Sequence, residues 1–375
     1  MKSISVRLSC SVSRSYRACR VRSMFNVAPV AGASFAAACQ LPVDERDWRV
    51  GLIVGPSGSG KSSIGRAAWS GRAYHRGFSW SSAPIIDDIA PERSFDEVAA
   101  ALSAVGLGSV PAWLRPFRAL STGEKFRADL ARILLSDRQQ IVVDEFTSVV
   151  DRQIARIGAG AFAKAWRRRP AGQVILLSCH RDIVEWTCPD WVLDTEGWNL
   201  QRGCLQRRPP IAIAVSQTNW SPWKAFEDHH YLKLPKMIAA TNYVATHDGE
   251  PVAHVAVSTT CGLKSARMCR LVVMPEWQGA GVGIRFMNWV AEQWLRGRNR
   301  YRRPMTTIFH TSHPGLASAL RRQPAWLYLG GRVLGENGSE SYRTMSASRG
   351  RPAGCRYGGH LRAVQGFRYV GGHDQ

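Results

Sequence analysis

Short apolar runs, separated by glycine-rich or polar loops, recur along the chain and have the length of buried strands. The clearest runs are 48–54, 140–143, 174–178 and 270–274. Apolar residues with helical spacing follow at 62–69, 126–135 and 284–295. Strands that alternate with helices in this way predict an α/β fold.

Near the N-terminus the apolar residues Ile4, Val6 and Leu8 alternate with polar ones, which is the period of a strand. Residues 1–24 also contain Arg and Ser and no acidic residue, as an organellar targeting segment would. The alternation favours a first strand and hairpin over that targeting segment.

A second series of strands begins after Pro209-Pro210, and Pro pairs break regular structure. Residues 211–215 predict its first strand, 242–246 and 252–259 predict a hairpin around Asp248-Gly249, and 306–310 predict a further strand. We therefore expect one domain over 1–206, a second over 207–330, and a loop-rich part of the second over 331–375 with a last strand at 367–370.

Composition excludes two classes of protein. Hydrophobic residues make up 45% of the 375 residues, which excludes global disorder, and no run approaches the roughly 18 apolar residues of a membrane helix. The nine cysteines form no C-x-x-C pair, which argues against a disulfide framework or a zinc site and predicts a reducing, cytoplasmic location.

Charge is the unusual feature of the composition. Fifty Lys and Arg against 28 Asp and Glu give a net charge of +22, and residues 217–375 alone hold 21 basic and 9 acidic side chains. This excess favours a polyanionic partner such as DNA or RNA. An Arg-rich coding bias accounts for the same numbers equally well.

The first motif that carries chemistry lies between the strand 48–54 and the helix 62–69, and it matches G-x-x-x-x-G-K-[ST]. Glycines in such a loop let backbone N–H groups surround a phosphate, and the helix N-terminus adds its dipole. Lys61 would reach the β- and γ-phosphates of a nucleotide, and the Ser62 hydroxyl would hold Mg²⁺. The nucleotide-binding residues are Gly55, Pro56, Ser57, Gly58, Ser59, Gly60, Lys61, Ser62 and Ser63.

A second motif ends the apolar strand 140–143 in two carboxylates, Asp144 and Glu145. Ligands of open parallel sheets bind at the C-terminal ends of the strands, so these carboxylates are placed for nucleotide chemistry. Asp144 would orient Mg²⁺ and Glu145 would polarise the attacking water. Alone, such a strand end is common.

The order of the further motifs identifies the class. The run Leu120-Ser121-Thr122-Gly123-Glu124 precedes a predicted helix, 148–151 follows the two carboxylates, and His180 follows the strand 174–178. Together these motifs resemble the signature, D-loop and switch histidine of ATP-binding cassette (ABC) ATPases. The resemblance implies that Glu145 and His180 act in ATP hydrolysis. It also implies that Ser121, Gly123 and Glu124 complete the site of a second copy in a homodimer.

The chain departs from that family in several places. No Gln occurs from 64 to 137, where the family has a Gln loop, and Asp87 or Asp88 is considered as its replacement. The signature has Thr122 and Glu124 where Gly and Gln are usual. The stretch 61–120 is short, which predicts a small helical part without a coiled-coil arm and a reduced coupling surface for transporter domains.

A second glycine-rich loop lies between the strand 270–274 and the helix 284–295. No Lys-[ST] follows it, so it is not a second nucleotide loop of the first kind. A dinucleotide loop would need G-x-G-x-x-G and an acidic residue about 20 positions later, and neither occurs. The loop runs Gln278, Gly279, Ala280, Gly281, Val282 and Gly283.

These residues resemble the Q/R-x-x-G-x-G/A loop of the GNAT N-acyltransferase superfamily, and the strand order over 208–330 fits as well. The resemblance implies acetyl-CoA or another acyl-CoA as donor, with its pyrophosphate on the N–H groups of 278–283. It implies that a backbone N–H near Val273 polarises the thioester carbonyl. His310, His313 and Tyr328 lie where a proton-transfer group is expected, and a structural role for each is the competing interpretation.

Two clusters bear on the acyl acceptor. Trp223, Phe226 and His230 fall on one helix face, which predicts either a packed helix or a pocket that stacks on a base. Arg residues interleave with Tyr301 over 296–303, and three more lie at 167–169. Such runs suit phosphate contacts, and a solvated helix end explains them equally.

The fold expected is thus α/β, a P-loop ABC ATPase domain followed by an α+β GNAT acyltransferase domain. The expected function is a soluble ATPase that uses ATP and Mg²⁺, dimerises, and gates acyl transfer from acetyl-CoA, with a nucleic-acid base as the favoured acceptor. Two alternatives stay open. One is a nucleic-acid clamp with a non-catalytic GNAT fold, and the other is the ATPase subunit of a transporter.

Overall fold

The computed structural model describes residues 1–11, 13, 15–27, 32–69, 73–75, 77–203, 208–230, 236–237, 239–334 and 362–372. By its internal contacts the chain divides into two compact units. Unit 1 comprises Met1–Phe78, Ser136–Val150 and Ala163–Pro209, and unit 2 comprises Ser79–Leu135, Asp151–Phe162 and Pro210–Gln375. The helical segment, as we call Ser79–Leu135, therefore belongs to the same unit as the C-terminal half.

Unit 1 is built on a six-stranded sheet in the order β4-β5-β6-β3-β7-β8. The first five strands are parallel and β8 is antiparallel to β7. The strands predicted near 48–54, 140–143 and 174–178 are its three central members. The bounds are β4 Tyr74–His75, β5 Gln140–Val143, β6 Gln173–Ser178, β3 Val50–Val54, β7 Trp191–Asp194 and β8 Asn199–Arg202.

Tryptophan rings fill the core beside β3. Trp191 packs edge-on against Trp48, with ring centroids 5.3 Å apart, and stacks on Trp69 at 6.2 Å. A Cβ on Gly51 would lie 2.0 Å from the Trp191 ring, so only glycine allows the ring to cover this strand. Helix α2 (Lys61–Ala68) follows β3, and the short helices η2 (Arg181–Ile183) and α8 (Val184–Thr187) follow β6.

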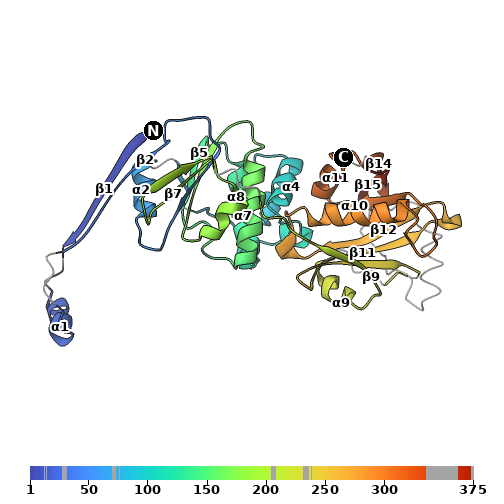
Figure 1. Ribbon diagram of the computed structural model, residues 1–375, viewed down its shortest axis with the longest axis horizontal. Helices are drawn as coiled ribbons and strands as arrows, with labels where there is room; N and C mark the ends of the chain where they lie inside the picture. The colour runs from blue at the N-terminus through green and yellow to red at the C-terminus, as the bar shows by residue number, and fades with distance from the viewer. Residues whose placement is uncertain are drawn as a thin grey trace. The chain divides into compact units, whose positions relative to one another are not determined.

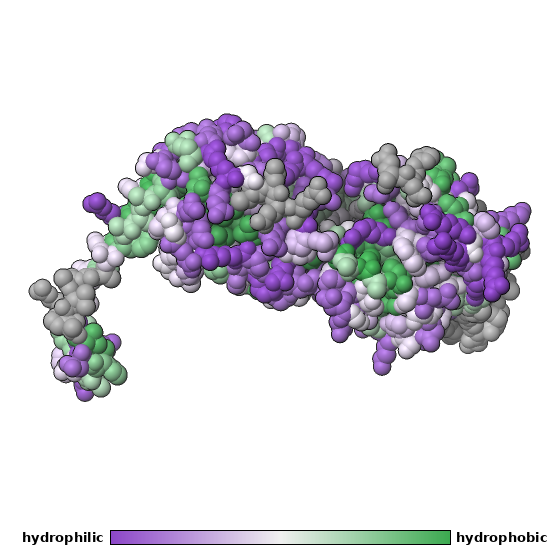
Figure 2. Space-filling view, viewed as in Figure 1, coloured by the Kyte–Doolittle hydropathy of each residue, from purple (hydrophilic) through white to green (hydrophobic). Residues whose placement is uncertain are grey.

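An N-terminal hairpin confirms the predicted first strand. Strand β1 (Lys2–Ser11) pairs antiparallel with β2 (Gly32–Leu41), and α1 (Tyr16–Met24), which was not predicted, lies between them in sequence (Figure 1). Ser15 caps α1, and none of its residues is buried. Tyr16, Met24 and Phe25 are exposed, and Figure 2 shows hydrophobic and polar side chains mixed over this helix.

The helical segment of unit 2 contains four α-helices and one 3-10 turn. Ser94 and Glu97 form a capping box at the start of α4, which explains why the helix begins there. Helix α7 (Arg152–Trp166) adds its first residues to unit 2. The elements are α3 Ile85–Asp88, α4 Phe95–Ala104, α5 Val110–Trp113, η1 Phe117–Ala119 and α6 Thr122–Leu135.

Asp129 on α6 is a source of pH-dependent stability. It accepts a hydrogen bond from Trp80 Nε1 at 3.0 Å, yet burial raises its pKa from 3.8 to about 6. A raised carboxyl pKa means that ionisation opposes folding, so wild-type stability falls as pH rises from about 4 to 6. Asp129→Asn keeps the acceptor and removes the charge. We expect it to raise the free energy of unfolding at pH 8 by about 3 kcal/mol, the free energy that corresponds to the difference between the folded and unfolded pKa.

Denaturant unfolding at several pH values tests this expectation. The gain of Asp129→Asn over wild type should vanish below about pH 4, where the carboxyl is protonated in both the folded and the unfolded chain. A gain that is equal at about pH 3.5 and about pH 8 would contradict it.

The C-terminal half forms a seven-stranded sheet in the order β14-β15-β13-β12-β11-β10-β9, antiparallel except for β12 and β13. Its hairpin turns at Asp248 and Gly249, both with positive φ, as predicted from the D-G pair. The strands are β9 Ala214–Thr218, β10 Thr241–His247, β11 Glu250–Thr259, β12 Ala266–Val273, β13 Thr307–Thr311, β14 Trp326–Leu334 and β15 Arg362–Tyr369.

Helices cover both faces of this sheet (Figure 1). Helix α10 (Val282–Leu295) buries Phe286 and Val290 on one face, and α9 (Trp223–Phe226) covers the other. Helix α11 (Pro314–Arg321) follows β13. The predicted last strand at 367–370 lies within β15, while β14 was not predicted. Most of the predicted C-terminal loop, 335–361, lies outside the described residues.

Candidate functional site

The phosphate-binding loop joins β3 to α2 in the predicted strand–loop–helix context. Gly58 and Gly60 have φ of +79° and +89°, and a Cβ on Gly60 would lie 2.2 Å from the Phe35 ring. Lys61 Nζ donates hydrogen bonds to the carbonyls of Gly55 at 2.8 Å and Pro56 at 2.7 Å. The ammonium therefore lies over the concave side of the loop, where a phosphate would be bound.

Oxygen atoms from β4, β5 and the start of α2 meet at the C-terminal edge of the unit 1 sheet. Ser62 Oγ donates to Asp144 Oδ1 at 2.9 Å, and the Tyr74 hydroxyl donates to Asp144 Oδ2 at 2.6 Å. A hydroxyl and a carboxylate beside a phosphate loop are the oxygen ligands that Mg²⁺ accepts together with nucleotide phosphates. The residues present therefore fit the predicted magnesium site, with Ser62 and Asp144 as its protein ligands.

Tyr74 was missed by the sequence analysis, because β4 has only two residues and little apolar pattern. It reaches Asp144 since β4 pairs parallel with β5, with Tyr74 opposite Val142. Burial and the neighbouring Asp144 raise the pKa of Tyr74, so the phenol stays a neutral hydrogen-bond donor.

At limiting Mg²⁺, Tyr74→Phe is expected to lower ATP turnover about three- to tenfold, because Asp144 loses one of the three hydrogen-bond donors that orient it. The effect should appear mainly in the Mg²⁺ concentration needed for half-maximal turnover. Phosphate release measured against Mg²⁺ concentration tests this. A fall in maximal turnover with an unchanged Mg²⁺ requirement would contradict the orienting role.

The other predicted residues of the ATPase lie at neighbouring strand ends. Glu145 has a φ of +53° and accepts a hydrogen bond from Ser148 Oγ at 2.7 Å. His180 follows β6, which lies between β5 and β3 in the sheet, and its N–H donates to Ser178 Oγ at 3.1 Å. Sheet order thus places the predicted catalytic residues on adjacent strands.

The signature residues begin α6 in unit 2. Ser121 Oγ accepts from Glu124 N at 3.3 Å, and Glu124 Oε2 accepts from Ser121 N at 2.8 Å. This reciprocal pair is a capping box, so Glu124 at this position stabilises the start of the helix. Arg115 adds an ion pair to Glu124 at 2.9 Å. Asp88, considered as a replacement for the Gln loop, accepts from Ser81 N at 2.6 Å.

The second glycine-rich loop leads into α10, as predicted. Gly279 and Gly281 have φ of +87° and +82°, and Gly281 is the N-cap of α10. Gln278 Nε2 donates to the carbonyl of Val273 at 3.1 Å, while its Oε1 accepts from Gly108 N at 2.9 Å. Gln278 therefore ties the loop to β12 and to the helical segment as well.

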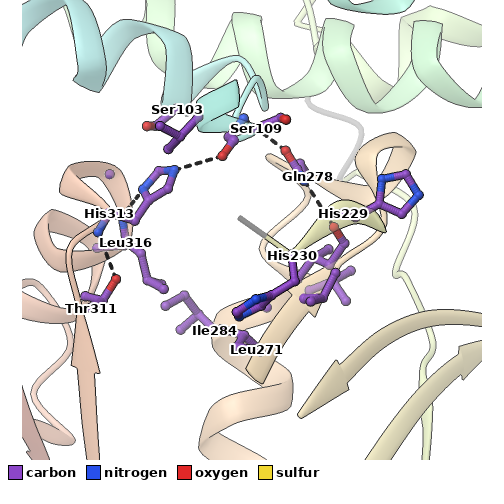
Figure 3. Close-up of a pocket in the computed structure, with 18 of the residues that line it drawn as sticks. Ser103, Ser109, His229, His230, Leu271, Gln278, Ile284, Thr311, His313 and Leu316 are labelled. Carbon is purple, nitrogen blue, oxygen red and sulfur yellow. Dashed lines mark hydrogen bonds between the residues drawn. The ribbon is translucent and has the colours of Figure 1, made fainter. Parts of the chain in front are cut away.

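A cavity of about 440 Å³ opens beside this loop (Figure 3). It exists because β12 and β13 pair only over Ala266–Met268 and Thr307–Phe309 and then separate. Residues 269–273 and 309–311 line the resulting gap, and the loop 278–283 closes one end. Ser103, Gly106 and residues 108–111 of the helical segment supply another wall, and Gly315, Leu316 and Ala319 also line the cavity. The predicted acyl-CoA loop and the strand that was expected to meet the acyl group thus both line the cavity.

Two of the three predicted proton-transfer candidates line the cavity. They are His310 on β13 and His313. His229 and His230 also line the cavity, and His230 belongs to the predicted aromatic cluster. Tyr328 is not among the lining residues, and its ring packs against Phe367 and the Arg321 guanidinium, 5.5 Å and 4.5 Å away.

His313 has a structural role. Its Nδ1 accepts from Leu316 N at 3.2 Å, which caps α11, and its Nε2 lies 3.0 Å from the Gly108 carbonyl (Figure 3). An acceptor at Nδ1 and a donor at Nε2 require one neutral tautomer. Burial lowers the pKa of His313, which agrees with a neutral ring.

The aromatic cluster is a packed core. Trp223 and Phe226 are buried against His254 of β11, at ring distances of 5.1 Å and 5.7 Å. Burial lowers the pKa of His254 to about 4, so it is neutral at physiological pH. No sequence signal marks His254, because an isolated His in an apolar strand resembles many structural ones.

The basic runs are partly engaged within the protein. Arg169 donates to the Ser136 carbonyl at 2.6 Å and stacks on Trp166, and Arg167 donates to the Thr187 carbonyl at 2.9 Å. Arg296 pairs with Glu292 at 2.5 Å, and Arg300 stacks on Tyr301. These contacts favour the structural interpretation for those four residues.

Two further kinds of site do not occur in the described part of the chain. Among the residues that the structure places, no group of three or more His, Cys, Asp or Glu side chains could hold a metal ion. No helix within the described ranges combines the length and apolar character needed to cross a membrane.

Known proteins match both halves. The model of the acetyltransferase (GNAT) domain family matches residues 239–322. The cytochrome c biogenesis ATP-binding export protein CcmA of Paramagnetospirillum magneticum is 29% identical over 168 residues, which cover 35% of this chain and 75% of that protein. CcmA of Rhodospirillum rubrum is also 29% identical over 168 residues, 36% of this chain and 69% of that protein.

Among solved structures, the ribosomal-protein-S18-alanine N-acetyltransferase of Escherichia coli aligns with a TM-score of 0.31 and 12% identity, over 44% of this chain and 97% of that one. The family match covers the second glycine-rich loop, and the curated relatives match the N-terminal half. The chain is therefore an enzyme whose N-terminal half is similar to ATP-binding proteins of the ABC type and whose residues 239–322 match the GNAT acetyltransferase domain.

Proposed function

We propose that the chain transfers an acyl group from acetyl-CoA, or another acyl-CoA, to an amine, and that ATP binding and hydrolysis control this transfer. One observation carries the link between the two activities. The signature residues Ser121–Glu124 lie in the same compact unit as the transferase domain, whereas Lys61 and Asp144 lie in the other unit. The part of the cassette that would sense a nucleotide of a second copy thus belongs to the same unit as the proposed acyl-CoA pocket.

In the ATPase, two copies would close head to tail, with the signature of one facing the nucleotide of the other. Lys61 and the loop N–H groups would bind the phosphates, and Ser62 and Asp144 would hold Mg²⁺, which neutralises phosphate charge. Glu145 would orient the attacking water, and His180 would contact the γ-phosphate end of the nucleotide. Trapping the nucleotide with Glu145→Gln should therefore convert monomers into dimers, and light scattering measures this.

In the transferase, the loop 278–283 would bind the pyrophosphate of acyl-CoA at the N-terminus of α10. The amine nitrogen attacks the thioester carbon, the C–S bond breaks, an amide forms, and the CoA sulfur leaves as a thiolate. The amine must lose one proton and the thiolate takes one. His310 lines the cavity and is our choice for the group that accepts the amine proton, while a backbone N–H near Val273 stabilises the oxyanion.

The acceptor we favour is a nucleic-acid amine, because residues 217–375 hold 21 basic and 9 acidic side chains. Nucleoside mass spectrometry of DNA and RNA from cells that express the chain tests this directly. A new N-acylated nucleoside that depends on the chain is the expected result. Acetylated protein or small amines with unmodified nucleosides would reject the nucleic-acid acceptor and retain the transferase. Consumption of acetyl-CoA that is indifferent to ATP would reject the control by ATP.

A further inference from the structure

We infer that the helical segment Ser79–Leu135 forms one wall of the acyl-CoA pocket and that Arg127 is the positioning residue that sets the pyrophosphate-binding loop. Acyl-CoA binding is then directly linked to whether the signature residues Ser121–Glu124 engage a nucleotide of a second copy. The inference rests on the proposed function, because it takes acyl-CoA as the occupant of the cavity and a nucleotide of a second copy as the partner of the signature.

Arg127 lies on α6, one turn after the signature, and only 3% of it is exposed. Its Nη1 donates to the carbonyls of Gly106, at 2.9 Å, and Pro275, and its Nη2 lies 3.5 Å from the carbonyl of Glu276. Pro275 and Glu276 lie just before the loop 278–283. A single buried guanidinium therefore joins the signature helix, the turn after α4 and the start of the loop.

A buried guanidinium that serves main-chain carbonyls must bring a compensating benefit, since burying a charge is costly. Burial lowers the pKa of Arg127 to about 10, so the group is still cationic at neutral pH. Its planar fork of donors can hold several carbonyls in fixed directions, which a Lys cannot do. The guanidinium thus fixes both the orientation of the carbonyls that precede the loop and their distance from α6.

The turn after α4 holds the other side of the loop. Gly106 has a φ of +85°, and a Cβ there would lie 2.3 Å from the Gln278 carbonyl oxygen. Gly108 N donates to Gln278 Oε1 at 2.9 Å. Opposite, a Cβ on Gly279 would lie 3.1 Å from both the Ala161 Cβ of α7 and the Gly106 Cα. The main chain of the loop packs directly on the main chain of the turn after α4. The loop therefore cannot shift unless this turn moves with it.

A third contact ties α4 to the far wall of the cavity. A Cβ on Gly315 would lie 2.1 Å from Ser103 Oγ, and His313 reaches the Gly108 carbonyl from the same side. Trp113 of α5 packs edge-on against the His313 ring at 5.5 Å. Figure 3 shows Ser103 and Ser109 of the helical segment beside His313 and Gln278 at the rim of the pocket.

Packed interfaces of this kind transmit displacement because they have no free volume to absorb it. If engagement of Ser121–Glu124 moves or stiffens α6, the loop follows through Arg127. Linkage is reciprocal, so acetyl-CoA must change the affinity for ATP by the same factor by which ATP changes the affinity for acetyl-CoA.

Calorimetric titration of the full chain in the Glu145→Gln background, with acetyl-CoA and Mg²⁺-ATP, tests the inference. We expect ATP to change the Kd of acetyl-CoA at least about threefold. Arg127→Met should weaken acetyl-CoA binding about tenfold, because charge-assisted hydrogen bonds to the loop are lost, and should reduce the effect of ATP to none. Arg132→Met is the matched control on the same helix, since Arg132 contacts the Ser79 carbonyl and the Trp80 ring instead.

Arg127→Met and Arg132→Met with equal affinities and equal ATP effects would overturn the inference and leave the proposed function standing. Failure of the unmutated chain to bind acetyl-CoA at all would overturn the proposed function itself. If Arg127→Met does not fold, the two Kd values of the parent chain, each measured with and without the other ligand, decide whether the sites are linked. Equal and reciprocal shifts of the two Kd values support the linkage, and two unshifted values reject it.

Discussion

Replacing Gly281 with Glu is expected to reduce acetyl-CoA binding at least about a hundredfold, through loss of the charge-assisted contacts to the pyrophosphate. Gly281 is the N-cap of α10, and a Cβ built on it meets nothing within 4 Å. The new side chain therefore enters open space at the helix N-terminus. Its carboxylate would accept the same N–H groups that the pyrophosphate needs and would repel the phosphates. Titration with acetyl-CoA measures the effect.

Gly281→Gln separates charge from backbone strain. Its side chain has the shape of Glu, and both variants carry the cost of a φ of +82°, about 1 kcal/mol for a residue with a Cβ. We expect the Gln variant to bind acetyl-CoA about tenfold more weakly than the unmodified chain, since only strain and partial blocking remain. Equal affinities of the two variants would show that an anion is not what this helix end binds.

Local signals in the sequence were sufficient for much of the fold. A phosphate loop needs a buried strand before it and a helix after it, and both loops have this context within about 20 residues. The hairpin was equally local, because the Asp248-Gly249 pair accepts the positive φ values that its turn requires. Such features are encoded by neighbours in the chain, so they can be predicted without knowledge of the tertiary structure.

The unpredicted features depend on contacts between distant parts of the chain. Arg127 in an amphipathic helix is expected to point to solvent, and no pattern marks the carbonyls of residues 275 and 276 as its partners. Tyr74 reaches Asp144 only because a two-residue strand pairs with β5. The association of the helical segment with the C-terminal half is also non-local. It is the reason why we propose that the ATPase signature and the acyl-CoA pocket are linked.

Lys61→Ala is expected to lower ATP turnover about 10²- to 10³-fold, the loss typical of removing one group that stabilises developing charge. The Lys61 ammonium donates hydrogen bonds to the carbonyls of Gly55 and Pro56, which are 2.8 Å and 2.7 Å away, so it lies within the loop that would surround the phosphates. Without it, no other Lys side chain of the loop can neutralise the γ-phosphate. Phosphate release under saturating Mg²⁺-ATP measures the loss.

The variant should fold as well as the parent. Lys61 is the first residue of α2, where a positive charge opposes the helix dipole, so its removal does not weaken the helix. Lys224→Ala, at an exposed position on α9, controls for the change in net charge and should retain full turnover. Acetyl-CoA binding in the absence of ATP should persist in Lys61→Ala, because the loop 278–283 lies in the other unit. Unchanged ATP turnover in this variant would remove the basis for assigning residues 55–62 to nucleotide binding, and the control of acyl transfer by ATP would have to be abandoned with it.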